Sequence, residues 1–319
     1  MLKRICTIAA IVLGYTLLPH THAAEVKVEK SDQGAKVLIG DELFTEYITD
    51  SGGKPVLWPV IGPTGKAMTR SYPIGEEQVE GERRDHIHHR SIWFTHGAIN
   101  GVDFWAESED HGITKHREFV TLKGGDQGLI ITRNDWLDAD GKKVMEDERT
   151  LVFGADEQHR WIDFQINMIA SEENVVFGDT KEGTFGVRVA GTMKADSEPG
   201  GHIVNSRGQT DGQAWGKPAE WVDYHGPVEG EHLGVAILNH PSSFRFPTYW
   251  HVRTYGLFAA NPFGLHDFRG ADTPSGEHTL KQGETMTLRY RVILHQGDEK
   301  AGRVAEAFDQ YRQAAAASP

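Results

Sequence analysis

Short segments in which polar and apolar residues alternate most constrain the fold of this 319-residue chain. Residues 26–30 and 35–39 alternate with a period of two around Asp32-Gln33-Gly34, which predicts a β-hairpin. Similar strands are expected at 129–132, 150–153, 161–169, 186–189, 234–238 and 285–293. Clusters of Gly and Asp separate these segments, and the 36 glycines fit a protein rich in turns. The chain is therefore expected to be mainly β.

A single large antiparallel β-sandwich over residues 24–319 is the predicted architecture, because no internal repeat and no Pro/Ser-rich linker interrupts the strands. Two small β-domains are the alternative. One helix is expected at about 300–317, with Asp298 as its cap. Val304, Phe308 and Tyr311 are spaced there as on one face of a helix.

The first 23 residues have the form of a signal peptide. Lys3 and Arg4 precede an apolar stretch at 5–18, and Thr21-His22-Ala23 offers small residues for cleavage before Ala24. The apolar stretch is short for a bilayer span, so an uncleaved anchor is the weaker alternative. A periplasmic or secreted protein is expected.

Cleavage would remove Cys6, the one cysteine. The mature chain would then have no disulfide, no thiolate nucleophile and no cysteine-bound metal. Loss of Lys3 and Arg4 would move the formal charge from -13 to -15, which argues against nucleic acid and anionic membrane surfaces as partners. No later segment is apolar enough to span a membrane.

The segment 83–105 concentrates residues that carry chemistry. It contains Asp85, His86, His88, His89, Arg90, His96 and Asp103 together with Trp93, Phe94, Phe104 and Trp105. If 85–93 is extended, His86 and His88 lie side by side on one face. Such a pair can hold a divalent metal, with His96 as a third ligand, or provide a general base and a neighbour that tunes its pKa. The alternative is a solvated polar strand.

The segment 239–264 is the second candidate. Loops around a short strand are predicted here, with Tyr249, His251 and Arg253 on one face. Arginine can bind a carboxylate, and tryptophan or tyrosine can stack on a sugar ring. Trp250 and Asn261 are further candidate contacts. The alternative is the edge of an aromatic core.

Two shorter segments complete the candidates. Glu182 lies in a glycine-punctuated loop at 177–186, where a carboxylate can act as an acid or base, although such loop residues are often only solvated. Trp221 shares a strand face with Asp223 and His225, and an edge strand with a buried tryptophan is the alternative.

The chain lacks the nucleophile elbow of α/β-hydrolases, a Walker loop, a Rossmann fingerprint and His-Glu-x-x-His.

Several long motifs resemble the bacterial family DUF6807, which is often labelled "methane oxygenase PmoA". They are D-H-I-H-H-R-S-I-W-F-T-H-G, N-G-V-D-F-W, E-G-T-F-G-V-R-V-A, E-W-V-D-Y-H-G and H-P-S-S-F-R-F-P-T-Y-W-H-V-R-T-Y-G-L-F-A-A-N-P-F-G. The resemblance covers nearly the whole mature chain. The methane monooxygenase subunit of that name is an integral membrane protein, whereas this chain offers no membrane span after its N-terminal segment. By analogy, the pattern is similar to the galactose-mutarotase-like supersandwich.

These observations predict an exported enzyme that hydrolyses, eliminates or epimerises at a sugar centre by acid–base catalysis. His86 or His88 would be the base, and His251 or Glu182 the acid. Arg90, Arg253 and Asn261 would orient the sugar, and Trp93, Trp221, Tyr249 and Trp250 would line its site. A non-catalytic glycan-binding protein is one alternative, and a copper oxidase with histidine ligands, as the inherited label suggests, is another. The sequence does not identify a cofactor, and a divalent metal bound by histidines is the one candidate.

Overall fold

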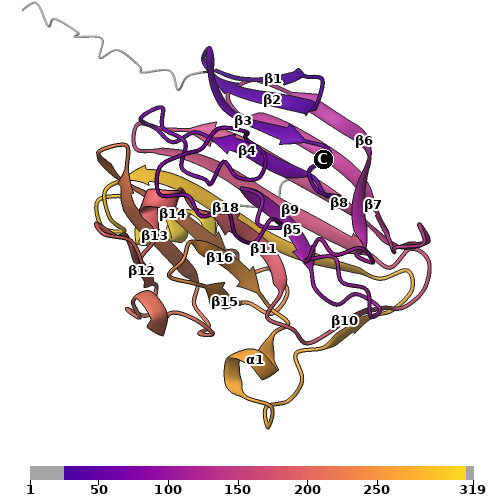
Figure 1. Ribbon diagram of the computed structural model, residues 1–319. Helices are drawn as coiled ribbons and strands as arrows, with labels where there is room; N and C mark the ends of the chain where they lie inside the picture. Colours follow the sequence, from indigo (N-terminus) through magenta and orange to yellow (C-terminus); the bar gives the residue numbers. More distant parts are fainter. Residues whose placement is uncertain (1–24, 314–319) are drawn as a thin grey trace, which may run out of the picture.

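The computed structural model describes residues 25–313, so the predicted signal peptide and residues 314–317 of the expected helix lie outside them. Two eight-stranded antiparallel sheets form the two layers of the molecule (Figure 1). The mainly β prediction is confirmed, and each expected strand is present. Most of the strands extend beyond the predicted residues, because alternation weakens where both faces of a strand are covered. None of the helices in the described part of the chain is long and apolar enough to cross a membrane.

The first sheet has the order β1-β2-β3-β4-β5-β11-β16-β15. Its strands are β1 (Val26–Lys30), β2 (Gly34–Ile39), β3 (Glu42–Ile48), β4 (Val56–Val60), β5 (Ile92–His96), β11 (Gly183–Arg188), β16 (Leu257–Asn261) and β15 (Tyr249–Val252). Strands distant in sequence are therefore neighbours at its centre, where β5, β11 and β16 lie side by side.

The second sheet has the order β12-β13-β14-β18-β9-β8-β7-β6. Its strands are β12 (His202–Asn205), β13 (Trp221–Val228), β14 (Glu231–Asn239), β18 (Thr285–Gln296), β9 (His159–Ile169), β8 (Lys143–Ala155), β7 (Gly128–Leu137) and β6 (Ile113–Lys123).

Small elements complete the described chain. They are the strand pair β10 (Val175–Phe177) and β17 (His278–Leu280), the 3-10 turns η1 (Gly191–Met193) and η2 (Asp211–Gln213), and the helices α1 (Leu265–Arg269) and α2 (Val304–Tyr311). The helix α2 begins later than predicted. Asp298 instead caps the turn before it, because its Oδ1 accepts hydrogen bonds from the backbone N–H groups of Lys300 and Ala301.

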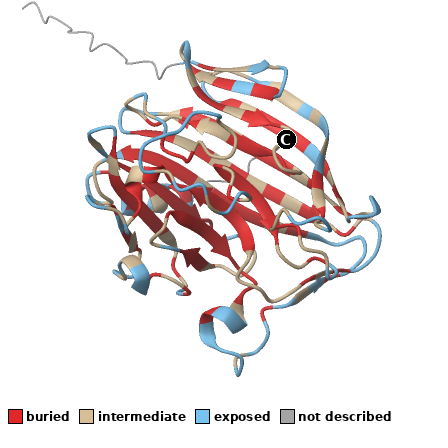
Figure 2. Ribbon diagram, in the orientation of Figure 1, coloured by how far each residue is buried: buried red, intermediate tan, exposed pale blue. Residues whose placement is uncertain are grey.

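The main core lies between the facing sheets. Phe94 of β5 stacks on Phe164 of β9 with ring centroids 6.1 Å apart, and Phe185 of β11 stacks on Tyr290 of β18 at 5.0 Å. Figure 2 shows buried residues through the centre of both sheets, while the helix α1 and many loops are exposed. One continuous set of buried side chains therefore joins both layers.

The outer face of the first sheet is covered as well. Trp93 of β5 points away from the main core and packs with Ile48, Trp105 and Leu257 in a smaller cluster. Its cross-strand partner is Gly186, where a Cβ would lie 2.6 Å from the Trp93 ring. Glycine is needed there because the indole lies directly over the strand. This outer cluster forms the floor under the loops that hold the candidate site.

Candidate active site

Three of the four segments singled out in the sequence meet at one pocket of about 450 Å³. The pocket is lined by His86, His88, His89, Asp103, Trp105, Ala106, Lys181, Glu182, His251, Arg253 and Tyr255. These residues come from the loops before and after β5, the loop before β11, and β15 with the turn that follows it. Because β5, β11, β16 and β15 are consecutive in the first sheet, the fold brings these loops together.

The histidine segment before β5 forms a turn, so residues 85–91 are not extended and the side-by-side arrangement of His86 and His88 on a strand does not apply. The backbone N–H of His89 donates to the carbonyl oxygen of His86 at 3.0 Å, and His86 and Ser91 have positive φ angles of 42° and 55°. The turn gathers the imidazoles instead of alternating them. His89 stacks on His86 with centroids 4.8 Å apart and meets His88 edge-on at 4.5 Å.

A buried ionic network holds this turn. Arg70 and Arg188 each donate to Oδ1 of Asp85 at 2.8 Å, and Arg70 also donates to the backbone carbonyls of His86 and His89. Although partial burial works against ionisation, Arg188, His86 and Arg70 hold the pKa of Asp85 below its usual range. Sequence reasoning singled out neither arginine as a site residue, because both are distant from the turn along the chain, although Arg188 lies within the motif E-G-T-F-G-V-R-V-A.

The same network orients two of the imidazoles. Nη1 of Arg188 lies 2.9 Å from Nδ1 of His89, and because a guanidinium can only donate, this nitrogen is the acceptor. Oδ2 of Asp85 lies 3.3 Å from Nδ1 of His86. Tyr255 also stacks on His86, with ring centroids 5.2 Å apart and planes 6° apart. His86 is therefore held by a carboxylate and an aromatic face.

His251 approaches the pocket from β15. Its Nδ1–H donates to the backbone carbonyl of Lys181 at 2.8 Å, so the neutral ring carries its lone pair on Nε2. Burial lowers the pKa of His251 to about 4, against the opposing effect of Glu182. The Glu182 carboxylate is paired with Nζ of Lys181 at 3.1 Å and stays partly exposed. A neutral imidazole and a carboxylate thus line the same cavity.

His88 is the second neutral imidazole of the pocket. Burial, together with the nearby Lys54 and His86, lowers its pKa to about 4. A histidine with such a pKa is unprotonated at neutral pH and can accept a proton from a bound molecule.

Two aromatic residues and one arginine shape the wall beside these groups. Trp105 is buried, and its Nε1–H has no hydrogen-bond partner among residues 25–313. Asp103 fixes the loop of Trp105, since its Oδ1 accepts from the backbone N–H groups of Trp105 and Ala106. The guanidinium of Arg253 lies 5.7 Å from the ring centre of Tyr255. The wall therefore offers a cation at an aromatic face.

The other residues predicted to contact the sugar do not line this pocket. Arg90 is bound through two 2.7 Å hydrogen bonds to the buried carboxylate of Glu107. Trp93 lies beneath the pocket, with its ring 5.3 Å from that of His89. Trp250 points into the main core, and its Nε1–H donates to the carbonyl of Ala219.

Tyr249 shares the outer face of β15 with His251, but its ring stacks on Phe268 at 5.8 Å. Asn261 uses its amide group on the backbone, donating to Thr180 and accepting from Phe263 and Gly264. Trp221 lies on the other sheet, in the cluster beneath α2.

The third proposed metal ligand, His96, is fully buried and does not line the pocket. Its Nε2 lies 2.9 Å from the carbonyl oxygen of Gly178. Across the described range 25–313, just one set of three histidine or acidic residues has ligand atoms within 4.8 Å of one another, and it does not include His86, His88 or His96.

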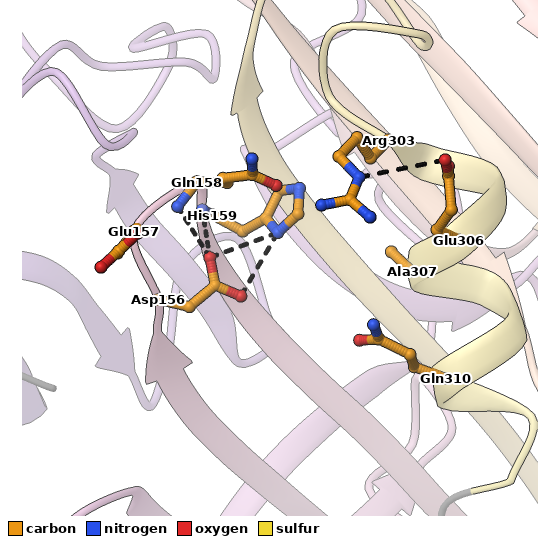
Figure 3. Close-up of a pocket in the computed structure, with 8 residues that line it drawn as sticks. All are labelled: Asp156, Glu157, Gln158, His159, Arg303, Glu306, Ala307 and Gln310. Carbon is orange, nitrogen blue, oxygen red and sulfur yellow. Dashed lines mark hydrogen bonds and ion pairs between the residues drawn. The ribbon is translucent and has the colours of Figure 1, made fainter.

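A second hollow, of about 360 Å³, lies between the β8–β9 turn and α2 (Figure 3). Its side chains serve the local structure. Asp156 accepts from the backbone N–H groups of Gln158 and His159, and Arg303 pairs with Glu306. Because no tryptophan, tyrosine or phenylalanine is among its lining residues, the first pocket is the stronger candidate site for a sugar.

Solved structures similar to this chain share little sequence with it. A heparan sulfate lyase HepC mutant from Pedobacter heparinus is 10% identical, with a TM-score of 0.37. A glycoside hydrolase family 97 enzyme from Pseudoalteromonas sp. strain K8 is 9% identical, with a TM-score of 0.31. Each match covers 87% of this chain and 36% of the other, so the chain spans about a third of their length. A galactose mutarotase related enzyme from Lactobacillus acidophilus is 10% identical over 86% of this chain and 96% of its own, with a TM-score of 0.29.

No curated protein matches the chain. A family model does match, over residues 34–309, which include every strand of both sheets except β1 and every residue of the pocket. The chain therefore belongs to DUF6807, a family of unknown function.

Proposed function

We propose that this protein is a carbohydrate-active enzyme that moves protons at a sugar centre bound in the pocket of His88, Glu182 and His251. The observation that carries the proposal is the placement of two neutral imidazoles and a carboxylate in one cavity beside aromatic walls. Acid–base catalysis needs a base that is unprotonated at the working pH, and burial supplies it twice.

The roles follow from the contacts. His251 acts as the base through Nε2, because Nδ1 is engaged with the Lys181 carbonyl. The low pKa of His251 suits it to accept a proton rather than to act as the acid. A second group, Glu182 or His86 in its protonated form, donates its own proton to the sugar, and exchange with solvent then restores both groups. Arg253 binds sugar hydroxyls or a carboxylate, and Tyr255 contributes an aromatic face.

Elimination or epimerisation fits this set better than hydrolysis by paired carboxylates. Hydrolysis in that manner needs two available carboxyl groups across the scissile bond. The pocket contains Glu182 and Asp103, but Asp103 already accepts two backbone hydrogen bonds that hold the Trp105 loop.

Incubation with a panel of neutral and uronic-acid sugars in D₂O, followed by proton NMR, tests the proposal. Proton transfer at carbon gives deuterium incorporation or a new double bond, whereas hydrolysis gives new reducing ends without either. Binding without any turnover across the panel would favour a glycan-binding protein instead.

Export to the periplasm or the medium is part of the proposal, because residues 1–23 have the composition of a signal peptide. Cell fractionation with N-terminal sequencing tests this part. A mature protein that begins at Ala24 outside the cytoplasm is expected, and a cytoplasmic chain that begins at Met1 would contradict it.

A further inference from the structure

Histidines form a row across the outer face of the second sheet, remote in the fold from the pocket. The strand register aligns His202 of β12 with His225 of β13, His225 with Gly234 of β14, and Gly234 with His295 of β18. Cross-strand partners share a face of the sheet, so these imidazoles point the same way. Gly234 makes room for the row, because a Cβ there would lie 2.1 Å from the His295 ring.

A buried carboxylate lies within this row. Asp223 is fully buried two residues before His225, and its Oδ1 lies 2.6 Å from Nδ1 of His225. Its Oδ2 lies 2.6 Å from Nε2 of His295. Glu299, in the turn between β18 and α2, places Oε2 4.0 Å from the same Nδ1 of His225. Two carboxylates thus flank one imidazole nitrogen.

We propose that Asp223, His225 and Glu299 form a binding site for a divalent ion of the zinc class. Their ligand atoms all lie within 4.8 Å of one another, and zinc is commonly bound by such a set of nitrogen and carboxylate donors. His295 completes the arrangement from outside, because its ring N–H fixes the second oxygen of Asp223, as partners of metal-bound carboxylates do.

The charge and the position of the set support a cation. Asp223 and Glu299 bring two carboxylates together in a largely buried place, where a divalent ion would balance them. The site reaches the surface beside His232, an exposed residue whose ring centre lies 5.2 Å from that of His225. Either His232 or water can take the fourth position.

The ion would have a structural role. Asp223 and His225 belong to β13, whereas Glu299 belongs to the segment that leads into α2, so a shared ion ties the C-terminal helix to the sheet. The helix covers Trp221 and Leu238 on this face.

Titration of the purified, chelator-treated protein with Zn²⁺ tests the site, using calorimetry for stoichiometry and thermal unfolding for stability. Wild type is expected to bind one zinc per chain and to gain roughly 3–5 °C in Tm at saturation. Glu299→Gln and His225→Gln should lose both effects. Glu306→Gln, which removes a carboxylate from an exposed pair in α2, is the matched control and should behave as wild type.

Two results would overturn the site. One is wild type without stoichiometric zinc binding. The other is binding that survives in Glu299→Gln and His225→Gln but disappears in a His86→Gln/His88→Gln variant, because the ion would then belong to the pocket. Glu299 is at the edge of the site, so Glu299→Gln keeps the test valid if His225→Gln fails to fold.

Discussion

Nδ1 of His251 lies 2.8 Å from the backbone carbonyl oxygen of Lys181, although the two residues are 70 positions apart in the chain. This one hydrogen bond fixes the tautomer of a buried imidazole and places it beside the loop that carries Glu182. A base from β15 and a carboxylate from the loop before β11 therefore meet because the sheet order places β11, β16 and β15 together. The pocket's chemistry depends on that strand order.

The pH dependence of turnover should reflect the buried bases. Burial lowers the pKa values of His88 and His251 to about 4, so both are unprotonated above that pH. We expect kcat/KM on the sugar substrate to fall by at least about tenfold per pH unit below pH 4, with no acidic limb near pH 6.5. Steady-state kinetics from pH 3 to pH 8 measure this. An acidic limb at pH 6–7 would show that the base has an ordinary pKa.

Buried His96 should make stability depend on pH. Burial lowers its folded pKa from 6.5 to about 4, so its contribution is fully present above pH 6.5 and is lost as the pH falls to 4. The difference in unfolding free energy between wild type and His96→Asn should therefore shrink by roughly 2–3 kcal/mol between pH 7.5 and pH 4.5. Urea unfolding at both pH values checks this, and a difference that stays constant would contradict it.

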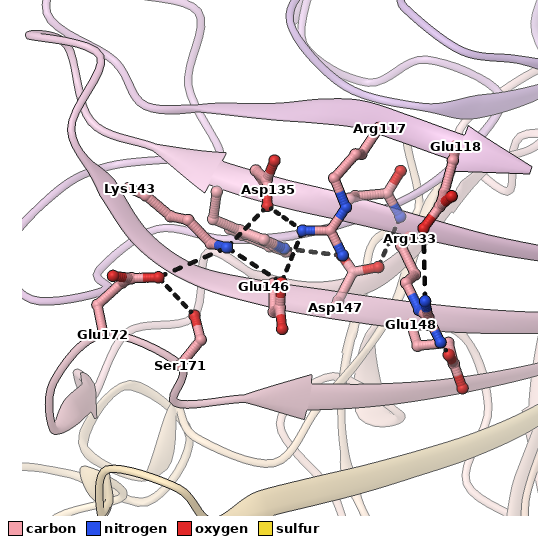
Figure 4. Close-up of polar contacts among 12 residues, drawn as sticks. Arg117, Glu118, Arg133, Asp135, Lys143, Glu146, Asp147, Glu148, Ser171 and Glu172 are labelled. Carbon is pink, nitrogen blue, oxygen red and sulfur yellow. Dashed lines mark hydrogen bonds and ion pairs between the residues drawn. The ribbon is translucent and has the colours of Figure 1, made fainter.

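Arg90 should matter for stability rather than for substrate binding. Its guanidinium makes two hydrogen bonds to Glu107, and the side chains of Arg90 and Glu107 are only 12% and 9% exposed. Arg90→Ala therefore removes positive charge that balances the buried Glu107 carboxylate. We expect a loss of about 3 kcal/mol in unfolding free energy. Arg117→Ala is the control, because Arg117 pairs with Asp135 and Glu146 on the exposed surface (Figure 4) and should cost about 1 kcal/mol or less.

Urea unfolding and substrate kinetics of these two variants separate the possibilities. The prediction is contradicted if Arg90→Ala is as stable as wild type and has a raised KM that Arg117→Ala does not share. Arg90 would then be a substrate contact, as the sequence suggested.

Arg253 should contribute to binding more than to turnover. It lies at the pocket with its guanidinium 5.8 Å from the Trp215 ring centre, and it offers a charge-assisted donor to the sugar. Replacing it by glutamine should raise KM by about 10- to 100-fold and change kcat only a few-fold. Arg207→Gln, at an exposed pair with Glu220, is the control. A large fall in kcat with unchanged KM would instead make Arg253 part of the chemical step.

The strands were predictable because their signal is local. Alternation along β9 survives in the structure, since this strand places one face in the main core. The sequence also indicated that Tyr249 and His251 share a face, which the pairing of β15 with β16 reproduces. Trp250 between them consequently points into the core, a result of the same alternation.

The site was predictable only in part. Residue types indicated which segments carry chemistry, but the turn at His86–His89 depends on Arg70 and Arg188, which reach it from other parts of the first sheet's outer face. Trp221 was grouped with the sugar site because tryptophans often stack on rings, whereas tertiary packing places it under α2. Long-range contacts of this kind leave no periodic trace in one sequence.

The most direct test of the central claim compares wild type with a His88→Gln/His251→Gln variant on one sugar substrate. Turnover would be followed by NMR in D₂O, and sugar binding by calorimetry on the same samples. We predict that the variant keeps its sugar affinity within a few-fold and loses turnover by about 10²-fold or more. Undiminished turnover in the variant would contradict the account, and so would a wild type that binds the sugar without converting it.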